Sequence, residues 1–439
     1  MKILLTGNGF DLEHGLPTSY MDFLDFCQRV ERIYTLNPEA TPEIYERNNL
    51  EDWKGNVVLK ENLRAAFESR KYQDRLPENA VDDREPVVES NALFNEIHNC
   101  LRGNPWLKYF ENVKKTMGRS WIDFEAEINR IVQQLDGLGA MTKPQINFRS
   151  FKYENDNINE LSRKVYKKLN PGKPEEMVPV DQFAASLYSE LERFIRALEV
   201  YIAGFVQEIA VERKSPDIEH LQPDRVLSFN YSNTYERVYG AGRDIVYDYI
   251  HGKADLNSNA RTSQLVLGIQ EYLSDDRKDQ DLLFLPFKKY FQRIYKSTDN
   301  AYLSWAYQFQ EEDARYRRNV QSFLAGEPVP QPKAPGRRHF FTDLASIPHT
   351  THELYIFGHS LDVTDGDVLR RLICNDSVQT TIFYQHKDAD DKSSLAKKIR
   401  NLVRVIGQDE LIRRTGGPMT RTRFRIFFAR ELLSSASLC

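Results

Sequence analysis

The feature that most constrains the fold is a short apolar run, close to the start of the chain, that ends in two glycines. Residues Lys2–Thr6 lead directly into Gly7-Asn8-Gly9, a pattern typical of a buried strand that enters a tight turn. Beyond the turn, Ser19 and Asp22 have the spacing of a capping box at a helix start. Apolar residues then recur at helical spacing. The sequence therefore predicts an opening unit of strand, glycine loop and helix.

Further strand-like runs lie mainly in the second half of the chain. They are Arg225–Phe229, Ile245–Ile250, Gln264–Leu267, Glu353–Phe357, Thr380–Tyr384 and Arg425–Phe428. Helical patterns at 365–373 and 393–406 separate the last of them. Short apolar runs that alternate with helices indicate a parallel sheet covered on both faces. We therefore expect an α/β fold with a Rossmann-like, mostly parallel sheet.

A large helical insertion is expected to interrupt this sheet. Between residues 31 and 215 the pattern is mainly helical, most clearly over Ser186–Glu212, where apolar residues recur every three or four positions. Loops are expected at about 70–90, at about 139–180 and in the proline-rich stretch 326–336. The predicted division is 1–30 (first strand, glycine loop and helix of the core), 31–215 (helical insertion), 216–270 (core), 271–350 (helical and aromatic insertion with the proline-rich loop) and 351–439 (C-terminal part of the core).

Charge and cysteine content exclude several classes of protein. The 60 Lys and Arg residues against 64 Asp and Glu give a formal net charge of −4, so no global basic excess is available for a nucleic-acid backbone. A local patch remains open for such a contact, made of Arg413, Arg414, Arg421, Arg423 and Arg425. The four cysteines form no CxxC pair, which excludes a disulfide framework and a Cys-based zinc site.

Apolar runs in the sequence are short. None approaches the ~20 residues of a membrane helix, so no membrane partner is expected. The apolar run at the N-terminus stops after three residues, too short for the core of a secretory signal. The expected setting is the cytoplasm.

Residues that could carry chemistry follow the predicted strands. Asn230, His251 and the turn Gly358–Asp362 each come at or just after a strand end, as does the Gly7–Asp11 loop. Open α/β sheets bind ligands at the carboxyl ends of their strands. A glycine loop lets backbone N–H groups approach a phosphate, an Asn amide can orient a ribose or a water, and His can act as a base near neutral pH.

Each of these residues also has a purely structural interpretation. The glycine loop can be an ordinary turn, Asn230 can form an Asx-turn, and His251 can be a structural histidine at a strand end. Asp365 can cap the next helix. A fifth segment, Trp121–Glu125, lies in the helical insertion, where aromatic residues are usually core, although Asp123 and Glu125 could face the cleft.

In combination these segments resemble the AbiH family of bacterial phage abortive-infection proteins. The resemblance spans residue 1 to about 407, in the order of the family. The matching segments are Asn8–Leu12 with His14–Leu16, Trp121–Glu125, Leu227–Tyr231 with Thr234–Glu236, Ile250–Gly252, Phe287–Arg293 and Phe357–Asp362. One departure is Gly268-Ile269-Gln270, where an acid is expected after the isoleucine. The resemblance implies an antiphage function.

AbiH proteins are remotely similar to sirtuin-type NAD-binding domains, as used by antiphage NAD hydrolases. This similarity implies a sirtuin-like core, NAD as substrate or ligand, and Asn230 and His251 as catalytic residues. The residues it implies for nucleotide binding are Gly7, Asn8, Gly9, Phe10, Asp11, Tyr231, Gly252, Gly358, His359, Ser360 and Asp362. Because the chain has no paired CxxC zinc module, protein deacylation is not expected.

Three classes of function remain open. The first is cleavage of NAD or a related nucleotide at the N-glycosidic bond, and the second is nucleotide sensing without turnover. The third is a metal-dependent nuclease that uses Asp11, Asp362 and Asp365, although no metal site is otherwise predicted. A phage-derived trigger and a second copy of the chain are the further partners considered.

Overall fold

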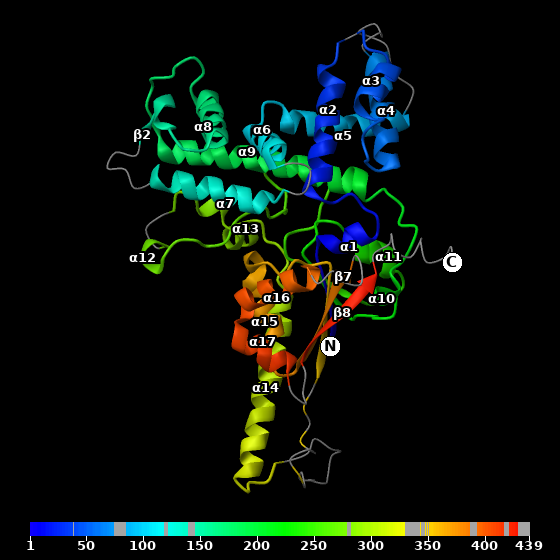
Figure 1. Ribbon diagram of the computed structural model, residues 1–439, viewed down its shortest axis with the longest axis vertical. Coiled ribbons are helices and arrows are strands. Elements are labelled where there is room, and N and C mark those ends of the chain that lie inside the picture. The colour runs from blue at the N-terminus through cyan, green and yellow to red at the C-terminus, as the bar shows by residue number, and fades with distance from the viewer. Residues whose placement is uncertain are drawn as a thin grey trace.

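The structure is a computed structural model of the 439-residue chain. It describes all residues except 38, 74–84, 118–121, 139–144, 279–281, 330–342, 344–346, 348, 350, 387–392, 417–420 and 429–439. Figure 1 shows a sheet with its covering helices below a large group of helices.

A six-stranded sheet forms the core of the fold. Its strands are β1 (Lys2–Thr6), β4 (Arg225–Ser228), β5 (Val246–Tyr249), β6 (His352–Phe357), β7 (Val378–His386) and β8 (Thr422–Phe428). They lie in the order β5-β4-β1-β6-β7-β8, and every pair is parallel. Numbered along the chain within this sheet, the order is 3-2-1-4-5-6, as in Rossmann folds. The predicted fold class is confirmed.

One predicted strand is wrong. Gln264–Leu267 is buried in part but forms no strand. Its backbone groups are satisfied in other ways: the Val266 N–H donates to the carbonyl of His251 at 2.9 Å, and the Leu267 N–H donates to the Gln292 side chain at 3.0 Å. An apolar run can therefore be buried without a neighbouring strand, because side chains can replace the ladder partners.

Helices cover both faces of the sheet, and alternate residues of β1 point to opposite faces. Ile3 and Leu5 belong to a buried apolar cluster that also contains side chains of α14 (Tyr302–Leu324), α15 (Gly366–Ile373), α16 (Ser393–Ile406) and α17 (Gln408–Thr415). Leu4 faces the other side, which is covered by α1 (Asn8–Glu13), α10 (Pro216–Glu219) and α11 (Thr234–Tyr239). Such two-sided burial explains the continuous apolar run Ile3–Leu5 of β1.

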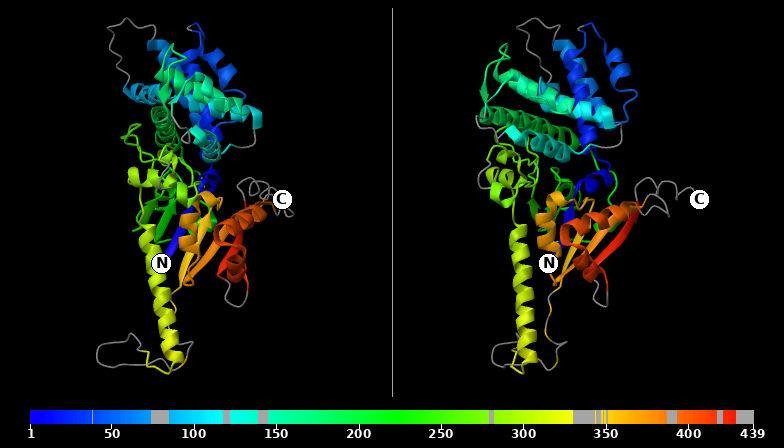
Figure 2. Two further views of the ribbon diagram at one scale, coloured as in Figure 1. Left: turned by 90° about the vertical axis from the view of Figure 1, so that its left-hand side faces the viewer. Right: turned by 60° about the vertical axis from the view of Figure 1, so that its left-hand side comes forward.

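The helical insertion forms a second layer beside the sheet (Figures 1 and 2). Its helices are α2 (Tyr20–Thr35), α3 (Pro42–Asn49), α4 (Val57–Gln73), α5 (Glu85–Leu101), α6 (Pro105–Met117), α7 (Phe124–Leu135), α8 (Asp156–Leu169) and α9 (Val180–Tyr201), the last continued by a π-helical turn over Ile202–Val206. Ser19 forms the predicted capping box of α2 with Asp22. The small strands β2 (Gln145–Ile146) and β3 (Val178–Pro179) pair antiparallel. Two further short helices are α12 (Asp275–Lys278) and α13 (Lys289–Tyr295), and short 3-10 turns lie at Asp136–Leu138, Phe148–Ser150, Leu285–Phe287 and Val363–Asp365.

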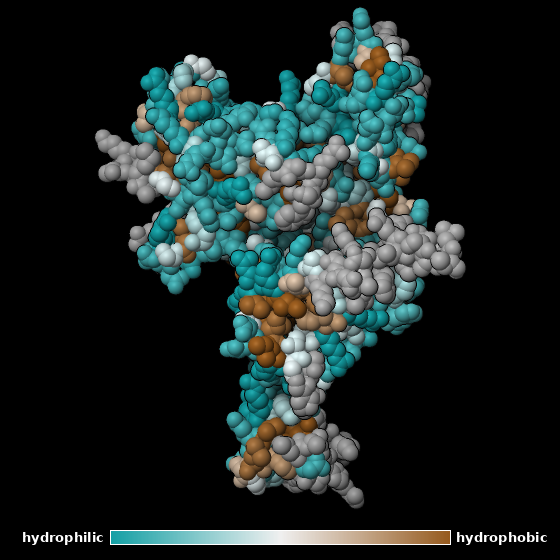
Figure 3. Space-filling view, viewed as in Figure 1, coloured by the Kyte–Doolittle hydropathy of each residue, from teal (hydrophilic) through white to brown (hydrophobic). Residues whose placement is uncertain are grey.

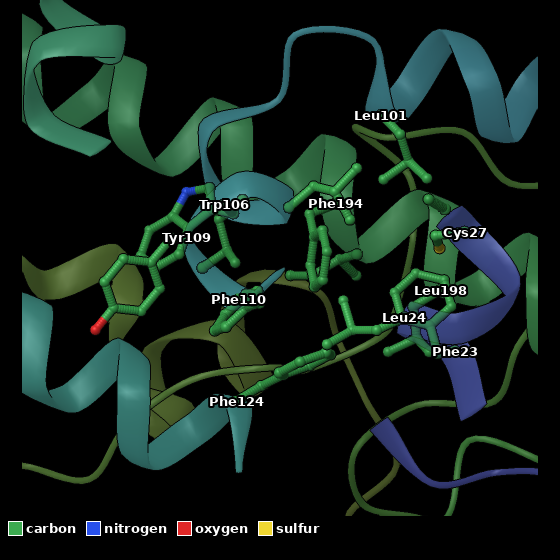
Figure 4. Close-up of a cluster of buried hydrophobic side chains, with 14 of the residues drawn as sticks. Phe23, Leu24, Cys27, Leu101, Trp106, Tyr109, Phe110, Phe124, Phe194 and Leu198 are labelled. Carbon is green, nitrogen blue, oxygen red and sulfur yellow. The ribbon is translucent and has the colours of Figure 1, made fainter. Parts of the chain in front are cut away.

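Aromatic side chains fill the centre of this layer. Phe110 and Phe124 stack with ring centroids 4.2 Å apart, and both rings contact Phe194. Figure 4 shows these rings converging from α6, α7 and α9. Phe124 follows Asp123, so the same packing that buries Phe124 fixes the start of α7, which faces the sheet.

Two of the predicted loops contain helix. α8 lies within 139–180; its polar composition conceals an apolar stripe of Ile158, Leu161 and Val165 that is buried. In the loop expected at 70–90, residues 70–73 belong to α4 and residues 85–90 to α5, and 74–84 lie outside the described residues. The predicted loop 326–336 is described only as far as residue 329, where it has no regular structure.

The surface view in Figure 3 is predominantly hydrophilic over the helical insertion. None of the helices in the described part of the chain has the length and apolar character that crossing a bilayer requires.

Candidate functional site

A cavity of about 550 Å³ opens at the carboxyl ends of β1, β4 and β6. One wall is formed by the loops that follow these strands, and the other by the starts of α2 and α7 together with Leu198 and Ile202. The strands β1 and β6 are neighbours, and the chain order of the strands reverses between them. Ligands of open α/β sheets bind at such a switch point.

Most of the sequence-predicted site residues line this cavity. They are Gly7, Asn8, Gly9, Asp11, Asn230, Tyr231, His251, Gly358, His359, Ser360 and Asp362. Two do not line it. Phe10 is buried among aromatic rings, including that of Phe357 at 5.9 Å between centroids. Gly252 belongs to a separate, smaller hollow beside Glu236 and Tyr247.

The loops after β1 and β6 bind directly to each other. The Gly7 N–H donates to the Phe357 carbonyl at 3.1 Å, and the Gly9 N–H donates to the Gly358 carbonyl at 2.8 Å. A Cβ on Gly7 would lie 2.6 Å from Cα of His359. The backbone N–H groups of Gly7 and Gly9 therefore hold the two loops together, and the missing side chains make this contact possible.

Replacing Gly358 with alanine should lower the free energy of unfolding clearly more than the same change at Gly242. Both glycines have positive φ, +70° and +72°, which costs about 1–2 kcal/mol for an alanine. A Cβ at position 358 would also lie 2.1 Å from the Phe10 nitrogen, whereas one at 242 would meet nothing within 4 Å. Denaturant unfolding of both variants measures the difference. Equal losses would contradict the loop contact.

The turn after β6 is held from the side by α16. The Lys398 Nζ donates to the His359 carbonyl at 2.6 Å, and the Asn401 amide donates to the Ser360 carbonyl at 3.0 Å. Within the turn, Leu361 has φ +61°, and its N–H donates to Nδ1 of His359 at 2.9 Å. Because Nδ1 accepts this bond, neutral His359 carries its proton on Nε2.

A buried charge network closes one end of the cavity. Lys289 Nζ lies 2.8 Å from a carboxylate oxygen of Glu125, in the helical insertion, and 2.8 Å from Oδ1 of Asp365, in the core. Nε2 of His359 lies 3.3 Å from Oδ2 of Asp365. Nε2 of His251 lies 3.4 Å from Oδ1, without the alignment of a hydrogen bond. One cation thus joins the two layers of the fold.

Burial and charge shift the protonation of this network. Burial raises the pKa of Glu125 to about 7, despite the opposing effect of Lys289. Burial also acts to raise the pKa of Asp365, but Lys289 and the two histidines outweigh it and hold that pKa well below its usual range. Burial, assisted by Lys289, lowers the pKa of His251 to about 4. At neutral pH the Asp365 carboxylate is therefore ionised and His251 is uncharged.

Asp11 is a second buried carboxylate at the cavity. The Ser232 hydroxyl donates to its Oδ2 at 2.6 Å, while Oδ1 has no hydrogen-bond partner within the described part of the chain. Burial raises the pKa of Asp11 to about 6, and the bond from Ser232 opposes this rise. A group with a pKa this close to neutrality is suited to exchanging a proton.

The raised pKa of Asp11 predicts a dependence of stability on pH. The pKa of Asp11 is higher in the folded than in the unfolded protein, so the folded state binds more protons between these two pKa values. The free energy of unfolding therefore has its full value below about pH 4 and falls as the pH rises through about 6. Asp11→Asn should remove about 1–3 kcal/mol of this loss between pH 4 and 7. Urea unfolding of both proteins across this range tests it; identical pH profiles would contradict the assignment.

Some site residues were not predicted individually. Lys289 lies within Phe287–Arg293, which resembles AbiH but has no role predicted from the sequence, and neither Lys398 nor Ser232 has one. Residues Asp123 and Glu125 do face the cavity, whereas Trp121 lies outside the described residues. Gln270, where an acid was expected, donates from its side-chain amide to the carbonyl of Val363.

The arginines near the C-terminus do not present a single basic face. Arg414 is fully buried and pairs with Glu410 at 2.7 Å. Arg413 pairs with Glu410 and Asp376, and Arg425 pairs with Asp217. At least three of the five are therefore engaged within the protein.

Comparison with known protein families gives a match over most of the chain. The family model described as bacteriophage abortive infection AbiH matches residues 3–386. No curated protein and no solved structure was found to match the sequence. Because the matched range covers most of the 439 residues, the chain belongs to the AbiH family of bacteriophage abortive infection proteins.

Proposed function

We propose that this antiphage protein binds NAD or a related nucleotide in the cavity and hydrolyses its N-glycosidic bond. The observation that carries the proposal is the position of the cavity at the switch point between β1 and β6 of a sheet ordered 3-2-1-4-5-6. Dinucleotides bind at this place in Rossmann folds. The volume of about 550 Å³ lies within the usual range of small-molecule sites. The remote similarity of AbiH proteins to sirtuin-type domains supports the same ligand.

The side chains around the cavity suit the parts of such a ligand. Lys398 is a cation at the wall, and burial lowers its pKa to about 8, so most molecules carry its charge at neutral pH. It is the proposed partner of a phosphate. Asn230 lies in the loop after β4, and Asp11 faces this loop. Both lie on the other side of the β1–β6 junction from Lys398. They offer an amide and a carboxylate to the hydroxyl groups of a ribose.

In the proposed reaction the bond between the nicotinamide nitrogen and ribose C1 breaks. The bonding electrons go to the positively charged ring, so nicotinamide leaves as a neutral molecule and needs no general acid. Water adds to C1 and releases a proton, which gives ADP-ribose. We assign Asn230 to orienting this water and His251 to accepting its proton.

His251 is available for this role but is a weak base. Its pKa of about 4 keeps it unprotonated at neutral pH, whereas an efficient proton acceptor has a pKa near the working pH. Asp11, with a pKa of about 6, is the stronger acceptor. As a carboxylate it would also stabilise the positive charge that develops on the ribose. Removing each side chain separately distinguishes the two assignments.

The two other classes of function have less support. In the nuclease hypothesis Asp365 would bind a metal, but its two oxygens already face Lys289 and His359. Among the described residues, no group of three or more His, Cys, Asp or Glu side chains is arranged to hold a metal ion. Nucleotide sensing would use the same cavity without turnover, and the experiment below separates it from hydrolysis.

The test is to incubate the purified protein with NAD, with and without a lysate of phage-infected cells. Release of nicotinamide and ADP-ribose in equal amounts supports the proposal. Thermal stabilisation by NAD without any product would instead support sensing, because a ligand that binds only the folded state raises its stability. If NAD neither stabilises the protein nor is converted to product, nucleotide binding is contradicted.

A further inference from the structure

The helical insertion contains a second large cavity, which shares no lining residue with the first. It has a volume of about 920 Å³ and is formed by residues of α2, α3, α6 and α8, by the end of α5 and by the segment between α5 and α6. We call it the insertion groove. Seven Lys and Arg side chains line it against two Glu side chains. This is a strong local excess in a chain whose net charge is −4.

Part of this positive charge is neutralised by neighbouring carboxylates. Arg29 lies 3.4 Å from Asp25, Lys164 lies 3.1 Å from Glu160, and Lys168 lies 2.6 Å from Glu190. One of the two glutamates of the groove is also engaged, since Glu31 contacts His98 at 2.7 Å. The Lys168–Glu190 and Glu31–His98 pairs join different helices, whereas the other two pairs each lie within one helix. Four further cations line the groove.

The four remaining cations lie on three different helices. Arg32, Lys108 and Lys115 form no ion pair with any residue that the structure describes, and Lys167 lies over the ring of Phe148 at 5.3 Å, a contact that leaves its charge in place. Opposite them, Glu111 is the lining carboxylate not engaged by a described ion pair. Cations held around one hollow repel each other, and a bound polyanion would relieve this repulsion.

We propose that the insertion groove binds the phosphodiester backbone of a nucleic acid, without regard to base sequence. No aromatic side chain is among the described residues that line it, so it lacks the stacking platforms that hold unpaired bases. Lys108 and Lys115 are seven residues apart on α6, which places them about 10 Å apart along the axis. A DNA duplex carries about one negative charge per 1.7 Å. Several phosphates therefore fit against this row of cations.

The experiment measures binding of fluorescent 20-base-pair DNA and RNA duplexes, of the single strands, and of ATP, over a series of salt concentrations. The triple variant Arg32→Gln/Lys115→Gln/Lys167→Gln should reduce the slope of log K against log salt by about 3. At about 50 mM salt it should weaken duplex binding by at least about 30-fold. Similar affinity for unrelated sequences is expected, and the DNA and RNA arms show which backbone is preferred.

The matched control is Lys54→Gln/Lys152→Gln/Arg213→Gln. These three side chains are exposed and lie outside the groove, so this variant should bind almost as the parent does. It has the same net charge as the first variant, because each loses three positive charges. The proposal is overturned if both variants weaken duplex binding equally, or if neither variant changes it. Tight binding of ATP without binding of either duplex would also overturn it. The proposal does not depend on NAD hydrolysis, because no variant touches the other cavity.

Discussion

Replacing Lys289 with methionine should lower the free energy of unfolding by about 3–5 kcal/mol. The side chain is buried between Glu125 and Asp365, which come from the helical insertion and from the core. Methionine fills a similar volume but leaves both carboxylates without their cation. Breaking a buried pair is far more costly than replacing all of its members, because it leaves charge in a medium that solvates it poorly. Urea unfolding of parent and variant measures the loss.

The adjacent lysine provides the matched control. Lys288 is equally buried but contacts Glu271, which remains partly exposed to water. Lys288→Met should therefore cost clearly less than Lys289→Met. A second control combines Lys289→Met with Glu125→Gln and Asp365→Asn, which removes the charges together and should restore much of the lost stability. If the triple variant is no more stable than Lys289→Met, the loss does not arise from unpaired charge.

Asn230→Ala and His251→Ala should each abolish phage protection while the protein remains folded. Removing a general base typically slows a reaction 10²–10⁴-fold, and a comparable loss is expected from a residue that orients the attacking water. Plaque counts on cells that carry each variant measure protection, and nicotinamide release measures the reaction. Thermal unfolding of the purified variants shows that a loss of protection is not a loss of fold.

Two residues outside the cavity control for the substitution itself. Asn233 lies on the same loop as Asn230 but does not line the cavity, and His220 is exposed on the surface. Asn233→Ala and His220→Ala should protect as the parent does. If Asp11→Ala abolishes hydrolysis while His251→Ala does not, Asp11 is the proton acceptor. Should both Asn230→Ala and His251→Ala protect fully, the mechanism assigned to these two residues is ruled out as the basis of defence.

The centre of the sheet could be predicted from the sequence because successive residues of β1 and β4, which point to opposite faces, are buried. Continuous apolar runs such as Lys2–Thr6 and Glu353–Phe357 are short and end in glycine turns, which gives a clear signal. The same signal fails at Gln264–Leu267, since burial alone produces the same apolar composition. The helix α8 gives only a weak signal in the sequence, because only one stripe of an otherwise polar helix is buried.

The site could be predicted only in part, for a related reason. Residues at strand ends, such as Asn230 and His251, gather at one edge of a parallel sheet whatever the details of packing. The position of Lys289 depends instead on Glu125 and Asp365, which lie far away in the sequence and meet only when the insertion packs on the core. No local pattern distinguishes this lysine from the adjacent Lys288.

The most direct test is the NAD content of infected cells that carry the parent gene or Asn230→Ala. With the parent, NAD should fall after infection, and nicotinamide and ADP-ribose should rise together. With Asn230→Ala, NAD should stay at the level of cells without the gene, and protection should be lost. Phage protection by the parent with an unchanged NAD pool, and without nicotinamide release, would contradict the proposed hydrolysis.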